Sequence, residues 1–130
     1  MYVRKIDLMI ITKKITPEYF GQIVKNICSA ETSSDINGWS DKNPLYGHCA
    51  VVSLLAQDYF GGELIRQSLL DYPEYKHLRS HFFNQLPDGT HVDFTIEQFN
   101  GGLPSVPEIV IKEREEVLKY PDTDIRYKIF

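Results

Sequence analysis

The sequence predicts a single α+β domain spanning residues 1–130, in which one buried helix packs on an antiparallel sheet. Three observations lead to this prediction. With 130 residues, the chain is long enough for one hydrophobic core and too short for two. A nearly continuous apolar segment of helical length covers residues 49–60. Two segments of strand character, 79–86 and 90–96, flank a Pro-Asp-Gly turn.

The N-terminal part of the chain combines a strand, a helix and a long loop. Residues 1–12 carry β-branched and apolar side chains, and we expect a strand there. Thr16 precedes a proline and is typical of a helix N-cap, and apolar residues at helical spacing extend the helix over 17–30. The polar stretch 31–46 is predicted to be a loop anchored by Trp39.

The central apolar segment predicts a helix that is buried on nearly all sides, because it lacks a polar face. Two consecutive glycines, Gly61 and Gly62, mark its C-terminus. The elements expected after it are strands over 63–70, 79–86 and 90–96, a loop over 100–107, a segment over 110–118 that fits either strand or helix, and a short final helix capped by Asp122 and Thr123.

Composition narrows the classes of function. The net charge of −4 argues against binding to nucleic acid or to an anionic membrane, because both need clustered cations. No apolar run approaches a membrane span, and the N-terminus lacks the features of a signal peptide, so we expect a cytoplasmic protein. Cys28 and Cys49 are too few for a disulfide framework and are expected to be free thiols. We expect no cofactor.

Cys49 is the first candidate for chemistry because it stands at the predicted N-terminus of the buried helix. The helix dipole and the unpaired backbone N–H groups favour the thiolate there. The same N–H groups can stabilise an oxyanion, and Gly47 lets the backbone approach a substrate closely. The alternative is that Cys49 is a small buried apolar residue. That role suits Cys28, which lies inside an amphipathic helix.

The predicted hairpin supplies two partners for this thiol. A three-residue Pro-Asp-Gly loop pairs Gln85 with His91 and, continued along both strands, His81 with Thr95. His81 and Asp93 then lie diagonally on one face of the sheet, close enough for a carboxylate to bind an imidazole. A two-residue loop would separate them onto opposite faces. The alternative is a solvated sheet face with incidental histidines.

These three residues predict a division of roles. Cys49 attacks a carbonyl carbon, His81 takes the thiol proton and later protonates the leaving group, and Asp93 orients His81. The sequence therefore predicts a cysteine-dependent amide or acyl hydrolase or transferase. Its substrate is expected to be a peptide or a small-molecule amide.

Several segments in the same order resemble the YunG-like bacterial family. They are residues 31–35 with Trp39, 43–50, 57–64, 81–84, Leu86, 88–89, 92–95, 98–99, 120–123 and 126–127. More remotely, the arrangement is similar to papain-like and transglutaminase-like enzymes, in which a helix-terminal Cys meets a His and an Asp or Asn on neighbouring strands. The resemblance implies a papain-like core with Cys49, His81 and Asp93 as its triad.

The same resemblance implies further substrate-binding residues. Papain-like proteases place an oxyanion-hole Gln six residues before the Cys, a position that Asn43 occupies here. Where YunG-like sequences are expected to have Gln directly before the Cys, this chain has His48, which we place in the pocket together with Gly47. The short chain, and the lack of a Trp after Cys49, argue against a protease with a deep substrate cleft.

Two other functions compete with the hydrolase. A zinc site would have to draw on His48, Cys49, His81 and His91, whose spacing fits none of the usual paired-ligand patterns, so we expect no metal. The second is a non-catalytic binding module on a papain-like scaffold, because a fold does not by itself determine a function.

Overall fold

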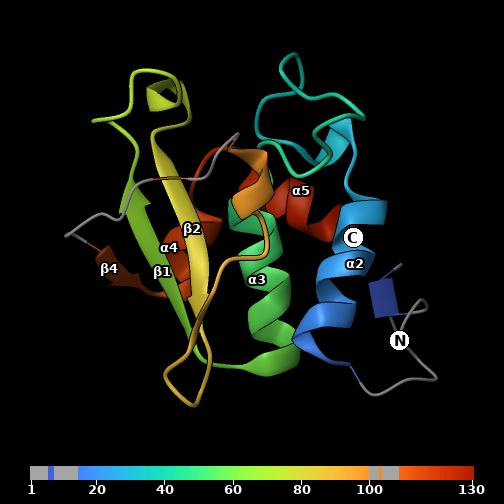
Figure 1. Ribbon diagram of the computed structural model, residues 1–130, viewed down its shortest axis with the longest axis vertical. Coiled ribbons are helices and arrows are strands. Elements are labelled where there is room, and N and C mark those ends of the chain that lie inside the picture. Colours follow the sequence, from blue (N-terminus) through green and yellow to red (C-terminus); the bar gives the residue numbers. More distant parts are fainter. Residues whose placement is uncertain (1–5, 8–14, 100–102, 104–108) are drawn as a thin grey trace.

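The computed structural model describes residues 6–7, 15–99, 103 and 109–130. Its α+β architecture is the predicted one: helices pack on an antiparallel sheet, and α3 lies between the sheet and α2 (Figure 1). The sheet has the order β3-β2-β1-β4. Its strands are β1 (Glu63–Ser68), β2 (Ser80–Gln85), β3 (His91–Val92) and β4 (Ile109–Lys112). The helices are α2 (Pro17–Ile27), α3 (Cys49–Phe60), α4 (Arg114–Leu118) and α5 (Thr123–Ile129), with 3-10 turns η1 (Ala30–Thr32), η2 (Lys76–Leu78) and η3 (Ile96–Gln98).

Helix α3 is the central element, with the predicted bounds, and all residues from Ala50 to Ala56 are buried. It ends at Gly61 and Gly62, which both have positive φ angles, 74° and 82°. A Cβ atom on Gly62 would lie 2.0 Å from the backbone oxygen of Gln85, so only glycine fits where the helix turns into the sheet.

Two hydrophobic clusters hold α3 from both sides. Toward α2 and the C-terminus, Val52 and Leu55 pack with Phe20, Val24 and Phe130. The second cluster, toward the sheet, contains Ala50, Leu54, Leu64, Phe82 and Val117. Because packing fixes the helix on two sides, the position of its first residue relative to β2 is fixed as well.

The N-terminal predictions are confirmed in part. Thr16 caps α2, since its Oγ1 accepts a hydrogen bond from the Tyr19 N–H at 3.1 Å. The helix ends before residue 30, because η1 begins there. Trp39 anchors the loop as expected, donating from Nε1 to the Pro44 carbonyl at 2.9 Å. Residues 6 and 7 are helical, so the predicted strand is wrong there, and the rest of 1–12 lies outside the described residues.

The hairpin has the predicted register but a shorter second strand. Gln85 pairs with His91, as the three-residue loop requires. After Val92 the chain leaves the sheet, so the expected pairing of His81 with Thr95 is wrong. At this point the carboxylate of Asp93 accepts a hydrogen bond from the Thr95 N–H at 3.2 Å, a local side-chain-to-backbone bond that favours a turn over a continued strand.

The remaining predictions concern β1 and the C-terminal part of the chain. Strand β1 stops at residue 68, and the ambiguous segment divides into β4 and α4. The last helix begins at the predicted position, although Asp122 adopts a positive φ of 62° and makes no side-chain cap. Apart from residue 103, the loop expected over 100–107 lies outside the described residues. No helix in the described part of the chain has the length and apolarity needed to cross a bilayer.

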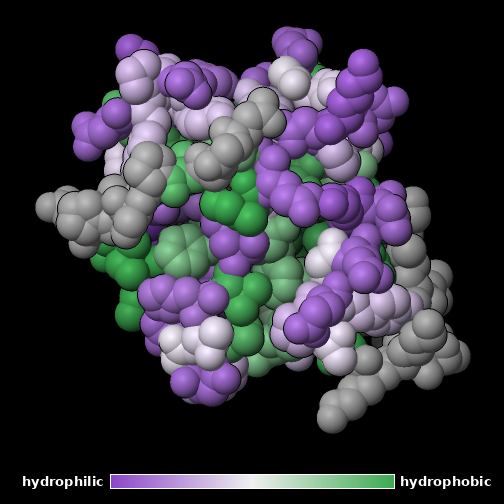
Figure 2. Space-filling view, in the orientation of Figure 1, coloured by the Kyte–Doolittle hydropathy of each residue, from purple (hydrophilic) through white to green (hydrophobic). Residues whose placement is uncertain are grey.

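Both faces of β2 are covered. Ser80, Phe82 and Asn84 are buried on the side of α3, and His81 is fully buried on the other side. In the space-filling view, hydrophobic residues gather along the middle of this face of the molecule, over β2 and α3, with polar residues around them (Figure 2). The alternative of a solvated sheet face with incidental histidines therefore does not apply to His81.

Candidate active site

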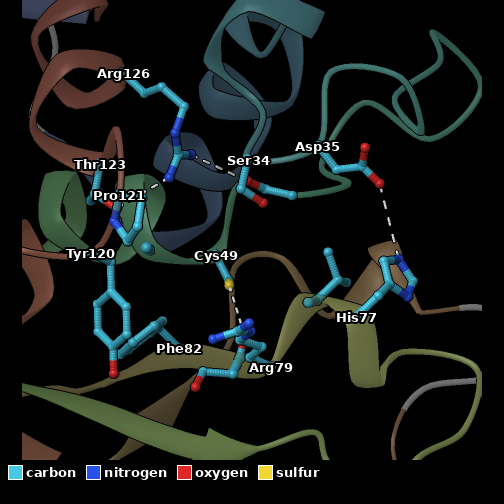
Figure 3. A pocket seen from close by; sticks show the side chains of 14 residues that line it. Ser34, Asp35, Cys49, His77, Arg79, Phe82, Tyr120, Pro121, Thr123 and Arg126 are labelled. Atoms are coloured by element: carbon cyan, nitrogen blue, oxygen red, sulfur yellow. Dashed lines mark hydrogen bonds and ion pairs between the residues drawn. The ribbon is translucent and has the colours of Figure 1, made fainter.

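A pocket of about 610 Å³ opens beside the N-terminus of α3 (Figure 3). Its walls come from four separate parts of the chain, and the lining residues are Ser34, Asp35, Gly47, Cys49, Ala50, residues 77–80, Phe82, Tyr120, Pro121, Thr123 and Arg126. Cys49 lines the pocket and its side chain is half-buried. The predicted nucleophile is thus accessible from a cavity large enough for a small organic molecule.

Cys49 is the first residue of α3, where the backbone favours negative charge. The first bond closing the helix runs from the Val52 N–H to the His48 carbonyl at 2.9 Å, so the N–H groups of Cys49 and Ala50 have no acceptor within the helix. The thiol donates to the Ser80 carbonyl at a sulfur–oxygen distance of 3.8 Å. This contact places the sulfur against the start of β2.

His81, on β2, is held between Asp93 and two aromatic rings. Its Nε2 lies 2.5 Å from Oδ2 of Asp93, whose side chain is 22% exposed. The ring stacks on Phe83 and meets Phe99 edge to face, with centroids 6.1 and 4.9 Å away. The other ring nitrogen, Nδ1, makes no hydrogen bond of ordinary geometry with any described residue, although the Cys49 thiol lies near enough to act on the ring electrostatically.

The electrostatics of this group favour a protonated His81. Burial lowers the pKa of His81, but the hydrogen bond to Asp93 and the interaction with Cys49 outweigh it and raise the pKa to about 9. The imidazole is therefore a cation at neutral pH. The structure brings Cys49, His81 and Asp93 together in the order that the sequence predicted.

Gln98 joins the loop before Cys49 to the turn that follows Asp93, a role that the sequence analysis did not assign to it. Its side chain accepts from the Gly47 N–H and donates to Thr95 Oγ1, both at 3.0 Å. Its backbone carbonyl accepts from the Asn43 amide at 3.1 Å. The loop before Cys49 is thereby tied to the turn that holds Asp93. The only earlier signal was the presence of Gln98 among the segments of the family resemblance.

Two of the three predicted substrate-binding residues lie in this tied loop. The amide of Asn43 donates to Gln98 and is not among the pocket residues. Gly47 does line the pocket, with a positive φ of 76°. A Cβ atom there would lie 2.2 Å from Ser33 Oγ, so contact with Ser33 is sufficient to require glycine.

His48, the third, lies in the core and not in the pocket. It is fully buried, with Nδ1 donating to the Tyr46 carbonyl at 2.9 Å and Nε2 2.7 Å from Thr32 Oγ1. Burial, with a smaller contribution from the charge of Arg126, lowers the pKa of His48 to about 4, although hydrogen bonds to backbone groups act in the opposite direction. His48 is therefore neutral at pH 7 and holds η1 against the loop before Cys49.

Arg126, on α5, is a pocket residue that the sequence analysis missed. It is 7% exposed and donates to the carbonyls of Thr32 and Gly47 at 3.1 and 3.4 Å and to Thr123 Oγ1 at 3.2 Å. Arg79 also lines the pocket, from the segment between η2 and β2. No local pattern marks either residue, because the pocket forms only when distant segments meet.

The remaining candidates take structural positions. Cys28 is buried in the core, where burial raises the pKa of its thiol to about 12. His91 is exposed and bonds Gln85 at 3.1 Å. Within the described ranges, no group of three or more His, Cys, Asp or Glu side chains is arranged to hold a metal ion.

Comparison with known proteins identifies the family. A family model described as "YunG protein" matches residues 16–130. The chain belongs to the YunG family. Among curated relatives of this YunG-family protein, the uncharacterized protein YunG of Bacillus subtilis (strain 168) is 31% identical over 99 residues, which cover 76% of this chain and 75% of the relative. No solved structure matches the chain. The matched range contains the whole candidate site.

Proposed function

We propose that this YunG-family protein is a cysteine-dependent amide or acyl hydrolase or transferase with a papain-like core. Cys49 is the nucleophile, His81 the general acid and base, and Asp93 the residue that orients His81. One observation carries the proposal. A fully buried imidazole bonds a carboxylate at 2.5 Å through one ring nitrogen and has a thiol beside it at a helix N-terminus that opens into a pocket.

The chemistry follows from this arrangement in two balanced steps. The thiolate of Cys49 attacks the carbonyl carbon and forms a C–S bond, while the carbonyl π electrons move to oxygen. The N–H groups of Cys49 and Ala50, which have no acceptor within the helix, would donate hydrogen bonds to that oxyanion. The His81 imidazolium then gives its proton to the leaving amine, the C–N bond breaks, and a thioester remains on Cys49.

The second step regenerates the enzyme. Neutral His81 takes a proton from a water molecule, whose oxygen attacks the thioester carbonyl. The C–S bond breaks, the acid leaves, and the thiolate is restored beside the imidazolium. An amine or alcohol in place of water gives acyl transfer by the same steps.

One feature favours a second candidate, a binding module on the same scaffold. The side-chain oxyanion donor that the papain-like resemblance implies, Asn43, is bonded to the Gln98 carbonyl. Stabilisation of the oxyanion then rests on backbone N–H groups alone. A site of this kind could bind a carbonyl compound without turning it over, so the reactivity of Cys49 decides between the two functions.

The first prediction concerns that reactivity. At about pH 6.5, iodoacetamide should alkylate Cys49 about tenfold faster than it alkylates glutathione, because a cationic His81 stabilises the thiolate. His81→Gln should remove most of this advantage, and so should Asp93→Asn, which leaves the ring in place. Mass spectrometry would quantify each cysteine over time, with buried Cys28 as the internal control that stays unmodified.

The pH dependence gives a second check on the same residue. Because the pKa of His81 is raised to about 9, the imidazolium is present below that pH and is lost as the pH rises through it. The advantage of Cys49 over glutathione should therefore disappear above about pH 9. If wild-type Cys49 reacts no faster than glutathione at pH 6.5, the hydrolase proposal is wrong and the binding module replaces it.

A further inference from the structure

The pocket beside Cys49 is cationic, although the chain as a whole carries a net charge of −4. Among the described residues, two arginines line it, Arg79 and Arg126, against a single carboxylate, Asp35. In Figure 3 the two arginines lie on opposite sides of the Cys49 side chain, and Asp35 lies apart from all three. The charge nearest the candidate nucleophile is thus positive.

The carboxylate of Asp35 is already bonded within its own loop. It accepts from the Tyr46 hydroxyl at 2.8 Å and from the Gly38 N–H at 3.2 Å, and His77 Nε2 lies 4.0 Å away. These partners stabilise its negative charge at the far end of the pocket. Asp35 therefore does little to neutralise the arginines.

Arg126 is a buried cation whose hydrogen bonds all go to neutral acceptors. Among the described residues it forms no ion pair, and its Nε is buried without a partner. The charges of Cys49, when ionised, and of Asp122 offset the cation from a distance. Burying an arginine without a contacting carboxylate is costly, so an anion entering the pocket would be bound favourably.

Arg79 adopts a backbone conformation that glycine would adopt more easily. Its φ of 67° ends η2 in the left-handed region, and its N–H bonds the Lys76 carbonyl at 3.0 Å. A non-glycine residue in this region is strained, and such strain is concentrated at functional sites. The backbone does not need an arginine here, so the reason for it lies in the side chain, which reaches the pocket.

Another part of the pocket wall is apolar. Phe82 and Tyr120 meet edge to face with ring centroids 5.5 Å apart, and Ala50 lies beside Cys49 at the start of α3. A ligand that fits both walls has an apolar part and an anionic group. Guanidinium groups match a planar carboxylate with paired hydrogen bonds.

We propose that the substrate is an amide or acyl compound with an apolar part and a carboxylate close to the scissile carbonyl, and that Arg79 and Arg126 bind this carboxylate. The substrate assignment rests on the proposed function of Cys49. The binding of a carboxylate beside the thiol can be tested independently of catalysis. In an alkylation experiment, catalysis predicts a fast reaction at Cys49, whereas carboxylate binding predicts a preference for an anionic reagent.

Iodoacetate and iodoacetamide form a matched pair of probes. Both react by forming a bond from sulfur to carbon with loss of iodide, and only iodoacetate carries a carboxylate one carbon from the reacting atom. The measured quantity is the ratio of their rate constants at Cys49, divided by the same ratio for glutathione. For the wild type at low salt we expect roughly a five- to tenfold preference for iodoacetate, which decreases in high salt.

Because the His81 cation also attracts an anion, the arginine is tested by substitution. Arg79→Gly keeps the backbone conformation and removes the charge, and it should lower the preference at least about threefold. Lys76→Gln is the control, since it removes the same charge from an exposed residue three positions earlier that does not line the pocket. It should leave the ratio within about twofold of the wild type.

The outcomes separate the two proposals. A reactive, His81-dependent Cys49 whose ratio is unchanged in Arg79→Gly overturns the carboxylate site and leaves the hydrolase standing. A Cys49 that reacts no faster than glutathione but still prefers iodoacetate, with the preference lowered in Arg79→Gly, supports anion binding in a pocket that is not catalytic. Equal effects of Arg79→Gly and Lys76→Gln would show a diffuse field in place of a site, and would also overturn the inference.

Discussion

Replacing Arg126 by methionine should lower the free energy of unfolding by about 3 kcal/mol. The guanidinium joins three segments, since it donates to the Thr32 carbonyl, to the Gly47 carbonyl and to Thr123 Oγ1. Methionine fills much of the same volume but donates nothing. The Thr32 carbonyl would then be buried without a hydrogen-bond donor, and the loop before Cys49 would lose its hydrogen bond to α5.

The methionine variant no longer buries a charge, but the stability gained in this way does not offset the lost hydrogen bonds. Replacing a buried ion pair by apolar residues can be neutral when both partners are replaced. The partners of Arg126 are two backbone carbonyls and a hydroxyl, and substitution cannot remove the carbonyls. The Gly47 carbonyl keeps another donor, the Ser34 N–H at 2.9 Å, whereas the Thr32 carbonyl has no second donor among the described residues. The cost of an unpaired buried acceptor therefore remains.

Urea unfolding and thermal melting would measure the change, with a decrease in Tm of roughly 10 °C expected for Arg126→Met. Lys128→Met is the matched control, because Lys128 lies on the same helix, its side chain is 71% exposed and its amine pairs with the exposed Asp124. It should change stability by less than about 0.5 kcal/mol. A loss below about 1 kcal/mol for Arg126→Met would show that α5 does not hold the loop through this side chain.

The parts of the structure that sequence patterns predict well are those fixed by a short segment. Helix α3 is one, because its apolar residues run unbroken from Ala50 to Ala56 and two glycines end it. The hairpin register is another, because Pro-Asp-Gly selects a three-residue loop and so fixes the pairing of Gln85 with His91. The register brings His81 within reach of Asp93, and the packing of α3 on the sheet then places Cys49 beside β2.

The features that sequence patterns miss depend on competition or on distant contacts. Asp93 binds its own backbone neighbour and ends β3, a local competition that a strand pattern does not reveal. Arg126 reaches the pocket from the last helix, and Arg79 enters from an irregular turn. His48 stands beside the candidate nucleophile in sequence, yet the first turn of α3 directs it into the core.

The burial of His48 gives the last prediction, on stability at acid pH. The pKa of His48 is lowered to about 4 in the folded protein, from an ordinary value near 6.5. Between these values the unfolded chain binds a proton that the folded chain does not, so this residue's contribution to stability is complete above pH 6.5 and is lost as the pH falls toward 4. The loss should reach on the order of 3 kcal/mol at pH 4.

His48→Gln should remove this term, because glutamine can bond Tyr46 or Thr32 but does not titrate. Urea unfolding at several pH values would give the free energy of unfolding of wild type and variant. In the difference between the two, the contribution of the carboxylates cancels because they titrate in both proteins. We expect wild type to lose about 3 kcal/mol relative to the variant between pH 7 and pH 4, and His91→Gln, at an exposed histidine, to follow the wild type. Parallel curves for wild type and His48→Gln would mean that His48 accepts a proton in the folded core. In that case Thr32 Oγ1 would accept from the protonated ring and donate to the Ser29 carbonyl, 3.2 Å away.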